Sequence, residues 1–384
     1  MTAKVLYIAF APLTARISHE WYIDLLTERG ITVEYWNLST LVDGLEEGHD
    51  SKVLECVRTF ASLAEFEAAL ALPENRAAVC IMLMGYGGRF VPIYRLISKY
   101  GGRTVYVAWG DMPQRSSQKW KARALTLLNS RDTAIRLLQK VRANTYSWLG
   151  LVGAYDVVFS SARDVARFRA HQIVTVNSND YEKFVKARTA PRTALPSPYA
   201  VFLDIFLPRQ SDIKFEKRRT VDPHNYFTSL NRFFDLIEAK FAVKVVIAAH
   251  PKAQYSPETF KGRSIIYGKT AEVVRDCQFV ISHHSTSIGY AVLNAAPAIF
   301  VYTQEMLELY RHQQVASIFE IANFLHSSIY NIDTISSDDQ IELKTVNAVQ
   351  YDKYKYQFLA TPETEGLETQ EIFYNEIHRL VMAP

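Results

Sequence analysis

The feature that most constrains the fold is an alternation of short, continuously apolar runs with longer amphipathic segments. In the first half these runs span 4–10, 31–38, 78–84, 104–109, 155–161 and 173–177. A second series spans 199–207, 243–250, 264–268, 279–285 and 298–303. Because the runs are apolar throughout and not at every second residue, we expect parallel strands with helices on both faces of the sheet. The predicted fold class is α/β.

The chain is expected to form two domains. Its 384 residues exceed one ordinary core, since domains usually hold about 100–200 residues. A segment with three prolines and three basic residues, 186–198, interrupts the pattern and predicts a boundary between domains at 1–195 and 196–384. We expect two doubly wound domains that face each other, with a C-terminal helix closing back. Ligands of such sheets bind beyond the carboxyl ends of the strands.

Composition excludes several classes of protein. Hydrophobic residues make up 48% and charged residues 22%, which is typical of a folded globular protein. A net charge of +3 gives no field suited to nucleic acid. No apolar stretch reaches the roughly 20 residues that cross a bilayer. We expect a cytoplasmic protein, with peripheral contact at the inner face of the membrane, through the basic run 214–219, as an open alternative.

Two glycine motifs do not fit the chemistry that they suggest. In "GYGGRF", 85–90, Phe90 stands where a dinucleotide-binding fingerprint needs Gly or Ala. In "GKT", 268–270, Arg263 stands where a P-loop needs its first glycine. The three cysteines lack metal or disulfide spacing. We therefore expect neither nicotinamide chemistry, nor P-loop chemistry, nor a zinc site.

Polar residues follow three apolar runs of the second series. They are His250, Pro251 and Lys252 after one run, Lys269 after the next, and Ser285, Thr286 and Ser287 after a third. Hydroxyl groups, including that of Thr270, are expected to cap helices whose N-termini attract a phosphate. Each cap can also be purely structural. Because a doubly wound sheet gathers its strand ends at one edge, the set together predicts a nucleotide site.

Asp204 interrupts the apolar run 199–207. A buried carboxylate costs free energy unless it is paired or used in chemistry. Two roles stay open at this point. The side chain either holds Arg209 or caps a loop, or it faces the cleft between the domains as a nucleophile or base.

Two of these segments resemble motifs of a known family. "AAHPK", 248–252, resembles the His-Pro motif, and "HSTS", 284–287, resembles the Ser-Ser/Thr motif, with which bacterial sialyltransferases and Kdo transferases of GT-B architecture hold CMP. The stretch 199–300 is similar to surface-polysaccharide enzymes related to retaining β-Kdo transferases. The N-terminal half resembles them only in general organisation.

The resemblance implies a GT-B fold, in which two Rossmann-like domains face a central cleft. The acceptor would bind to 1–195, and the CMP-activated sugar, Kdo or a related ulosonic acid, to 196–384. By this resemblance, the residues that would hold CMP are His250, Pro251, Ser285 and Thr286. Asp204 would be the nucleophile of a retaining transfer to a surface polysaccharide or lipopolysaccharide.

Asp204 departs from the sialyltransferase pattern. Ile205 and Phe206 follow it in place of a second acidic residue and glycine, which weakens an inverting mechanism with Asp204 as general base. A non-catalytic subunit that binds a nucleotide sugar is a further alternative. No D-x-D triplet occurs, so we expect an enzyme without a metal or other cofactor.

The first domain offers candidates for a second acid or base and for acceptor binding. Asp111 and His19 are the acid/base candidates, although a structural role is the default for each. By fold analogy alone, Arg16, His19 and Arg89 are expected to contact a glycan or lipid-linked glycan acceptor.

Overall fold

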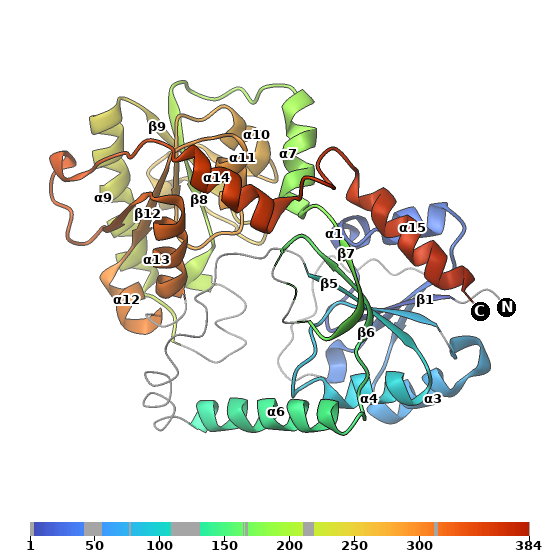
Figure 1. Cartoon of the computed structure of the whole chain (residues 1–384). Coiled ribbons are helices and arrows are strands. Elements are labelled where there is room, and N and C mark those ends of the chain that lie inside the picture. The colour runs from blue at the N-terminus through green and yellow to red at the C-terminus, as the bar shows by residue number, and fades with distance from the viewer. Residues whose placement is uncertain are drawn as a thin grey trace.

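The computed structural model describes residues 4–41, 56–76, 78–108, 131–163, 165, 168–209, 219–310 and 314–383. In these residues the chain forms two lobes, each built on one parallel sheet with helices around it (Figure 1). The predicted α/β class and the pair of doubly wound domains are confirmed. The boundary at 195/196 stays a prediction, since the two sheets are separated by the longer interval 176–198.

The first sheet has seven strands in the order β3-β2-β1-β4-β5-β6-β7, all parallel. Its strands are β1 (Val5–Ala9), β2 (Val33–Asn37), β3 (Val57–Thr59), β4 (Val79–Met82), β5 (Arg103–Ala108), β6 (Tyr155–Ser160) and β7 (Ala170–Thr175). Its helices are α1 (Ala15–Glu20), α2 (Ile23–Glu28), α3 (Leu63–Ala71), α4 (Val91–Lys99) and α6 (Arg131–Trp148). The helix α7 (Asn179–Thr189) follows β7 and leads to the second sheet. The strand order reverses between β1 and β4, so the switch point of this lobe lies there.

The second sheet has six parallel strands in the order β10-β9-β8-β11-β12-β13. Its strands are β8 (Tyr199–Leu203), β9 (Lys244–Ala249), β10 (Ile265–Tyr267), β11 (Val280–Ser282), β12 (Ala298–Tyr302) and β13 (Ser328–Asn331). The helices that follow are α9 (Pro223–Phe241), α10 (Thr270–Arg275), α11 (Ile288–Leu293), α12 (Gln304–Tyr310), α13 (Gln314–Leu325), α14 (Ala348–Tyr354) and α15 (Thr369–Met382). Here the switch point lies between β8 and β11.

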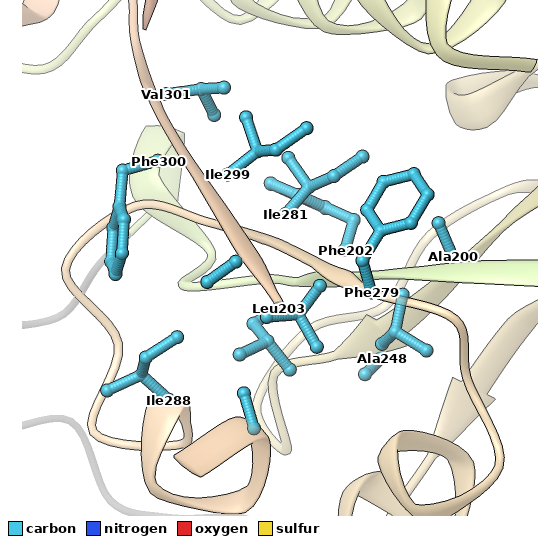
Figure 2. Close-up of a cluster of buried hydrophobic side chains, with 14 of the residues drawn as sticks. Ala200, Phe202, Leu203, Ala248, Phe279, Ile281, Ile288, Ile299, Phe300 and Val301 are labelled. Carbon is cyan, nitrogen blue, oxygen red and sulfur yellow. The ribbon is translucent and has the colours of Figure 1, made fainter. Parts of the chain in front are cut away.

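The central strands of both sheets are buried on their two faces, which explains why they are continuously apolar, whereas the edge strands β3, β7 and β10 are partly exposed. In β1, Val5 and Tyr7 join one core cluster, while Leu6 and Ile8 join the cluster on the opposite face. In the second lobe, apolar side chains from β8, β11 and β12 meet in one cluster (Figure 2). Burial on both faces distinguishes such parallel sheets from antiparallel sheets that expose one face to solvent.

The structure corrects the expected extent of the run that contains Asp204. The strand β8 ends at Leu203, and the residues expected to continue it to 207 form a turn and then a short 3₁₀ segment, Leu207–Arg209. Phe206 adopts a left-handed backbone, φ 53°, which no strand can accommodate. Asp204 therefore lies at the end of a strand and not within one.

Two helices cross between the lobes. The helix α7 packs against α10 and α11 of the second lobe, yet its Glu182 accepts a hydrogen bond from the Tyr22 hydroxyl of the first lobe at 3.0 Å. In the opposite direction, α15 leaves the second lobe and buries Phe373 and Ile377 in the core beside β1 and β4 (Figure 1). The predicted C-terminal helix that packs back is confirmed.

None of the described helices is both long and apolar enough to cross a bilayer.

We predict that Phe373→Ala destabilises the first lobe by about 3–5 kcal/mol, the usual cost of emptying a buried aromatic site. The Phe373 ring lies 4.9 Å from Phe159 and 5.1 Å from Tyr22, between centroids, and is 1% exposed. Urea denaturation followed by tryptophan fluorescence measures this, because all five tryptophans lie within residues 1–148. Met382→Ala, in the same helix but 58% exposed, should change stability by less than about 0.5 kcal/mol. Equal midpoints for the two variants would contradict the packing of α15.

Candidate functional site

Polar residues collect at the carboxyl edge of the second sheet. The strand β8 lies between β9 and β11, and its last residue, Leu203, pairs with Ala248 of β9 and Ser282 of β11. Neighbouring strands are about 4.8 Å apart, so the three loops that follow them begin side by side. This edge includes the switch point, which is where doubly wound sheets bind their ligands.

Asp204 is the buried carboxylate at this edge, with 6% of its surface exposed. Its Oδ2 accepts the His250 backbone N–H at 3.0 Å and the Tyr255 hydroxyl at 2.9 Å. Its Oδ1 accepts the Phe206 backbone N–H at 2.9 Å. The carboxylate thus ties the loop after β9 to the loop after β8, which is the loop-capping role that the sequence left open.

The same environment leaves Asp204 one position for chemistry. Burial raises the pKa of its carboxyl, and the hydrogen bonds from His250, Phe206 and Tyr255 offset part of that rise. A carboxylate offers about four acceptor positions. Among the described residues three donors are bound, two on Oδ2 and one on Oδ1. The remaining lone pair, on Oδ1, is the one that a nucleophile or a general base would use.

Phe206 carries backbone strain at this point. For an L-residue the left-handed conformation costs about 1–2 kcal/mol, and the hydrogen bond from its N–H to Asp204 helps to hold it. The turn brings the Phe206 ring parallel to the His250 imidazole, with an interplanar angle of 11° and centroids 6.2 Å apart. Strain of this kind collects at functional sites.

His250 follows β9 and is half-buried. Its Nδ1 accepts the Lys252 backbone N–H at 3.2 Å, so the proton of the neutral ring lies on Nε2. Pro251 and the Lys252 side chain are exposed in the turn that follows. The predicted trio therefore stands at the sheet edge, with the imidazole oriented by the main chain and Lys252 exposed.

Lys269 lies at the same edge but beyond β10, two strands away from β8. It is exposed and is itself the residue that precedes α10, while Thr270 is the first helical residue. The expectation that Thr270 caps this helix is wrong, because no side-chain cap is formed there.

The two histidines after β11 differ in their environment. His283 is fully buried, with Nδ1 2.6 Å from the Val301 carbonyl oxygen and Nε2 2.9 Å from the Tyr226 hydroxyl. The carbonyl oxygen can only accept, so Nδ1 donates and Nε2 accepts from the hydroxyl. Burial lowers the pKa of His283 to about 4. Both nitrogens are satisfied, and this residue is a structural histidine of the core.

His284 is the residue that sequence reasoning missed. Its Nδ1 is buried and has no hydrogen-bond partner among the described residues, and burial lowers the pKa of the ring to about 4. A buried polar atom without a partner is uncommon and needs an explanation, such as a role toward a bound molecule. The adjacent "HH" pair was the available signal, but the sequence alone does not tell which ring enters the core.

Ser285, Thr286 and Ser287 connect β11 to α11. Ser285 is nearly buried, and its Oγ accepts the Ser287 backbone N–H at 3.3 Å. Thr286 is exposed, and Ser287 precedes α11 without a side-chain cap. The hydroxyls lie at the predicted edge, but the expected capped helix start is replaced by this local turn.

The predicted acceptor residues of the first lobe lie at its own switch point. Arg16 and His19 are exposed on α1, after β1, and the Arg16 Nε lies 3.9 Å from a Glu20 carboxylate oxygen. Arg89 is exposed in the loop between β4 and α4. Asp111 lies outside the described residues. The neighbouring strands β1 and β4 therefore bring the three predicted acceptor residues to one edge.

A second carboxyl group, Asp180, lies where the lobes meet. It stands in the first turn of α7 and is hydrogen-bonded to Tyr290 of α11, and burial raises its pKa to about 6. The neighbouring Lys183 forms an ion pair with Glu20 of α1 at 3.0 Å. Sequence reasoning missed this residue, because "SND" is typical of an ordinary helix start and its partner, Tyr290 of α11, lies 110 residues further along the chain.

Comparison with known proteins identifies the architecture. No family model matches the chain, and no curated protein matches its sequence. Among solved structures, the wall teichoic acid polymerase TagF is similar with a TM-score of 0.51 at 11% identity, over 98% of this chain and 89% of that chain. Spinosyn forosaminyltransferase SpnP is similar with a TM-score of 0.50 at 10% identity, over all of both chains. This is the GT-B fold.

In the GT-B fold of this chain, the second lobe gathers the buried Asp204 carboxylate, an oriented imidazole, two lysines and several hydroxyls at one sheet edge. It also places there a ring nitrogen, His284 Nδ1, with no hydrogen-bond partner in the described part of the chain. Cations and donors of this kind suit an anionic ligand such as a phosphate, and the carboxylate suits nucleophilic or base chemistry. Across the described residues, no group of three or more His, Cys, Asp or Glu is placed to hold a metal ion.

We predict that His284 makes stability depend on pH between about 6.5, the pKa of an unfolded histidine, and its folded value of about 4. In this range the His284 side chain is protonated in the unfolded chain but stays neutral in the folded protein. The free energy of unfolding therefore falls as the pH drops through this range. The loss from this group is about 2–4 kcal/mol. Chemical denaturation from pH 7 to 4 should give a shallower dependence for His284→Gln than for the wild type. Parallel curves for the two proteins would contradict the lowered pKa of this ring.

Proposed function

We propose that the protein is a glycosyltransferase that moves a sugar from a CMP-activated donor, Kdo or a related ulosonic acid, to a surface-polysaccharide or lipopolysaccharide acceptor. The observation that carries the proposal is Asp204, a buried carboxylate fixed by main-chain donors at the strand ends of the second lobe. The "HPK" and "HSTS" segments flank it on the neighbouring strands. The GT-B fold and the similarity to structures named as a transferase and a polymerase support this class of reaction.

The donor binds along the edge that β8, β9, β10 and β11 share. Its phosphate meets donors from two sides. His250 and Lys252 lie after β9, in the turn that Pro251 shapes, with Lys269 beyond. Ser285, Thr286 and Ser287 lie after β11. Hydrogen bonds to ionised groups are about twice as strong as neutral ones. They act most on the phosphate that departs as CMP, because its charge grows in the transition state. No cofactor or metal is needed for this arrangement.

The reaction is a double displacement. Asp204 Oδ1 attacks the anomeric carbon, the bond from that carbon to the phosphate oxygen breaks, and CMP leaves with the electron pair. The acceptor hydroxyl then displaces the carboxylate and gives its proton to a base, which yields net retention. Asp111 and His19 remain the candidates for that base, and Asp180 joins them because its pKa of about 6 suits proton transfer near neutral pH.

A second candidate is a subunit that binds a nucleotide sugar without transferring it. The three hydrogen bonds on Asp204 favour it, since they give the carboxylate a structural role that needs no chemistry. An inverting transferase with Asp204 as general base uses the same Oδ1 lone pair. In each case the partners are the nucleotide sugar and a glycan or lipid-linked glycan, not nucleic acid, and the location is the cytoplasm or the inner face of the membrane.

We predict that Lys252→Ala and Lys269→Ala each weaken CMP binding at least about tenfold, since a charge-assisted hydrogen bond contributes about 1.5–3 kcal/mol. Isothermal titration calorimetry with CMP measures the change. Lys344→Ala, which removes another exposed lysine away from this edge, is the matched control and should bind CMP as the wild type does. Unchanged affinity in both test variants would rule out the proposed phosphate contacts.

We predict a covalent sugar on the peptide that contains Asp204 after incubation with CMP-Kdo, detected by intact-mass and peptide mass spectrometry. Asp204→Asn should give no adduct, whereas Tyr255→Phe keeps the carboxylate and removes one of its three donors, so it should still form the adduct. Transfer with inverted configuration and without an adduct would show that Asp204 acts as a general base and not as the nucleophile. Tight CMP binding without transfer to any of a broad panel of acceptors would favour the binding subunit.

A further inference from the structure

A pocket of about 780 Å³ lies beside the candidate donor site, outside the set of residues assigned to it. It opens between the first half of α9 and the loop after β9 that includes the 3₁₀ segment η4 (Pro257–Phe260). Its volume falls in the range of small-molecule sites, about 300–1,000 Å³. Two of its lining residues, Phe206 and Tyr255, also contact His250 and Asp204.

The pocket has an aromatic wall against which a sugar ring can stack. Phe206, Phe227 and Tyr255 line it, and their rings pack edge to face, with interplanar angles of 79° and 82°. The apolar face of a pyranose needs only one aromatic surface, which this wall provides.

The polar part of the wall is electrically balanced. Arg232 and Lys261 face the pocket together with Asp235 and Glu258, so the formal charges cancel. Lys261 is already paired with Asp235 at 2.8 Å, and the Arg232 guanidinium donates to the Ile332 carbonyl oxygen at 2.6 Å. A phosphate or a carboxylate would gain little net attraction here, because the carboxylates of Asp235 and Glu258 balance the two cations.

The rim of the pocket offers both hydrogen-bond donors and hydrogen-bond acceptors. His224, Thr228 and Gln254 are exposed lining residues that offer donors and acceptors. Sugar hydroxyls are donors and acceptors at once, so they match such a mixed wall. A CMP-activated ulosonic acid, which carries a phosphate and a carboxylate, does not.

We propose that this pocket binds an uncharged saccharide unit, at a site separate from the donor site. The unit stacks on the aromatic wall and exchanges hydrogen bonds with the rim, and it touches the outer faces of the two side chains that hold His250 and Asp204. The inference goes beyond the proposed transfer reaction and does not depend on the identity of the donor.

The test uses the full chain and the methyl pyranosides of glucose, galactose, mannose and rhamnose as probes. Saturation-transfer NMR and titration should detect binding of at least one of them. Thr228→Trp places a bulky side chain at the exposed rim of the pocket and should weaken that binding at least tenfold. Ala239→Trp adds the same side chain at an exposed position of α9 that does not line the pocket, and it should bind as the wild type does.

Three outcomes would overturn the proposal. The first is no binding of any of the four glycosides to the wild type, and the second is equal binding by the wild type and Thr228→Trp. The third is loss of CMP affinity in Thr228→Trp, which would make the pocket the nucleoside end of the donor site. Failure of CMP to bind the wild type would count against the proposed donor but leaves the saccharide result intact, so the two ideas fail separately.

Discussion

The candidate site depends on one buried carboxylate and on the need to satisfy it. Asp204 lies at the end of β8 with 6% of its surface exposed, where an unpaired charge would be costly. Its three donors come from the loops after β8 and β9. Satisfying the carboxylate therefore fixes the turn at Phe206, the start of the His250 loop and the Tyr255 hydroxyl together, and with them one wall of the neighbouring pocket.

A second constraint joins this edge to the first lobe. The helix α7 packs on the second lobe but binds Tyr22 of the first through Glu182, while α15 returns from the second lobe to fill the first core. Each lobe thus completes its packing with an element that the chain delivers through the other (Figure 1). Asp180 lies in the first turn of α7, and burial raises the pKa of its carboxyl while the hydrogen bond with Tyr290 of α11 opposes that rise.

Much of the architecture was predictable because its signals are local. Continuous apolar runs predicted parallel strands, and the length of the chain predicted two domains. The sequence also singled out Asp204, since a carboxylate inside an apolar run is conspicuous. It could not show that β8 stops at Leu203, because that stop depends on the left-handed turn at Phe206, which the carboxylate itself holds. Thr270 looked like a cap, yet the helix begins one residue earlier than that reading allows.

The sequence by itself determined the fold class, the two sheets and the types of side chain that stand at the strand ends. The physical reason is that apolar runs and the residues that end strands are local features of the sequence. Only the tertiary structure decided which of these side chains meet. Asp204 and His250 are 46 residues apart and touch because β8 and β9 pair in one register. Likewise, whether His283 or His284 is satisfied in the core depends on Tyr226 and Val301, partners that only the packed sheet brings within reach.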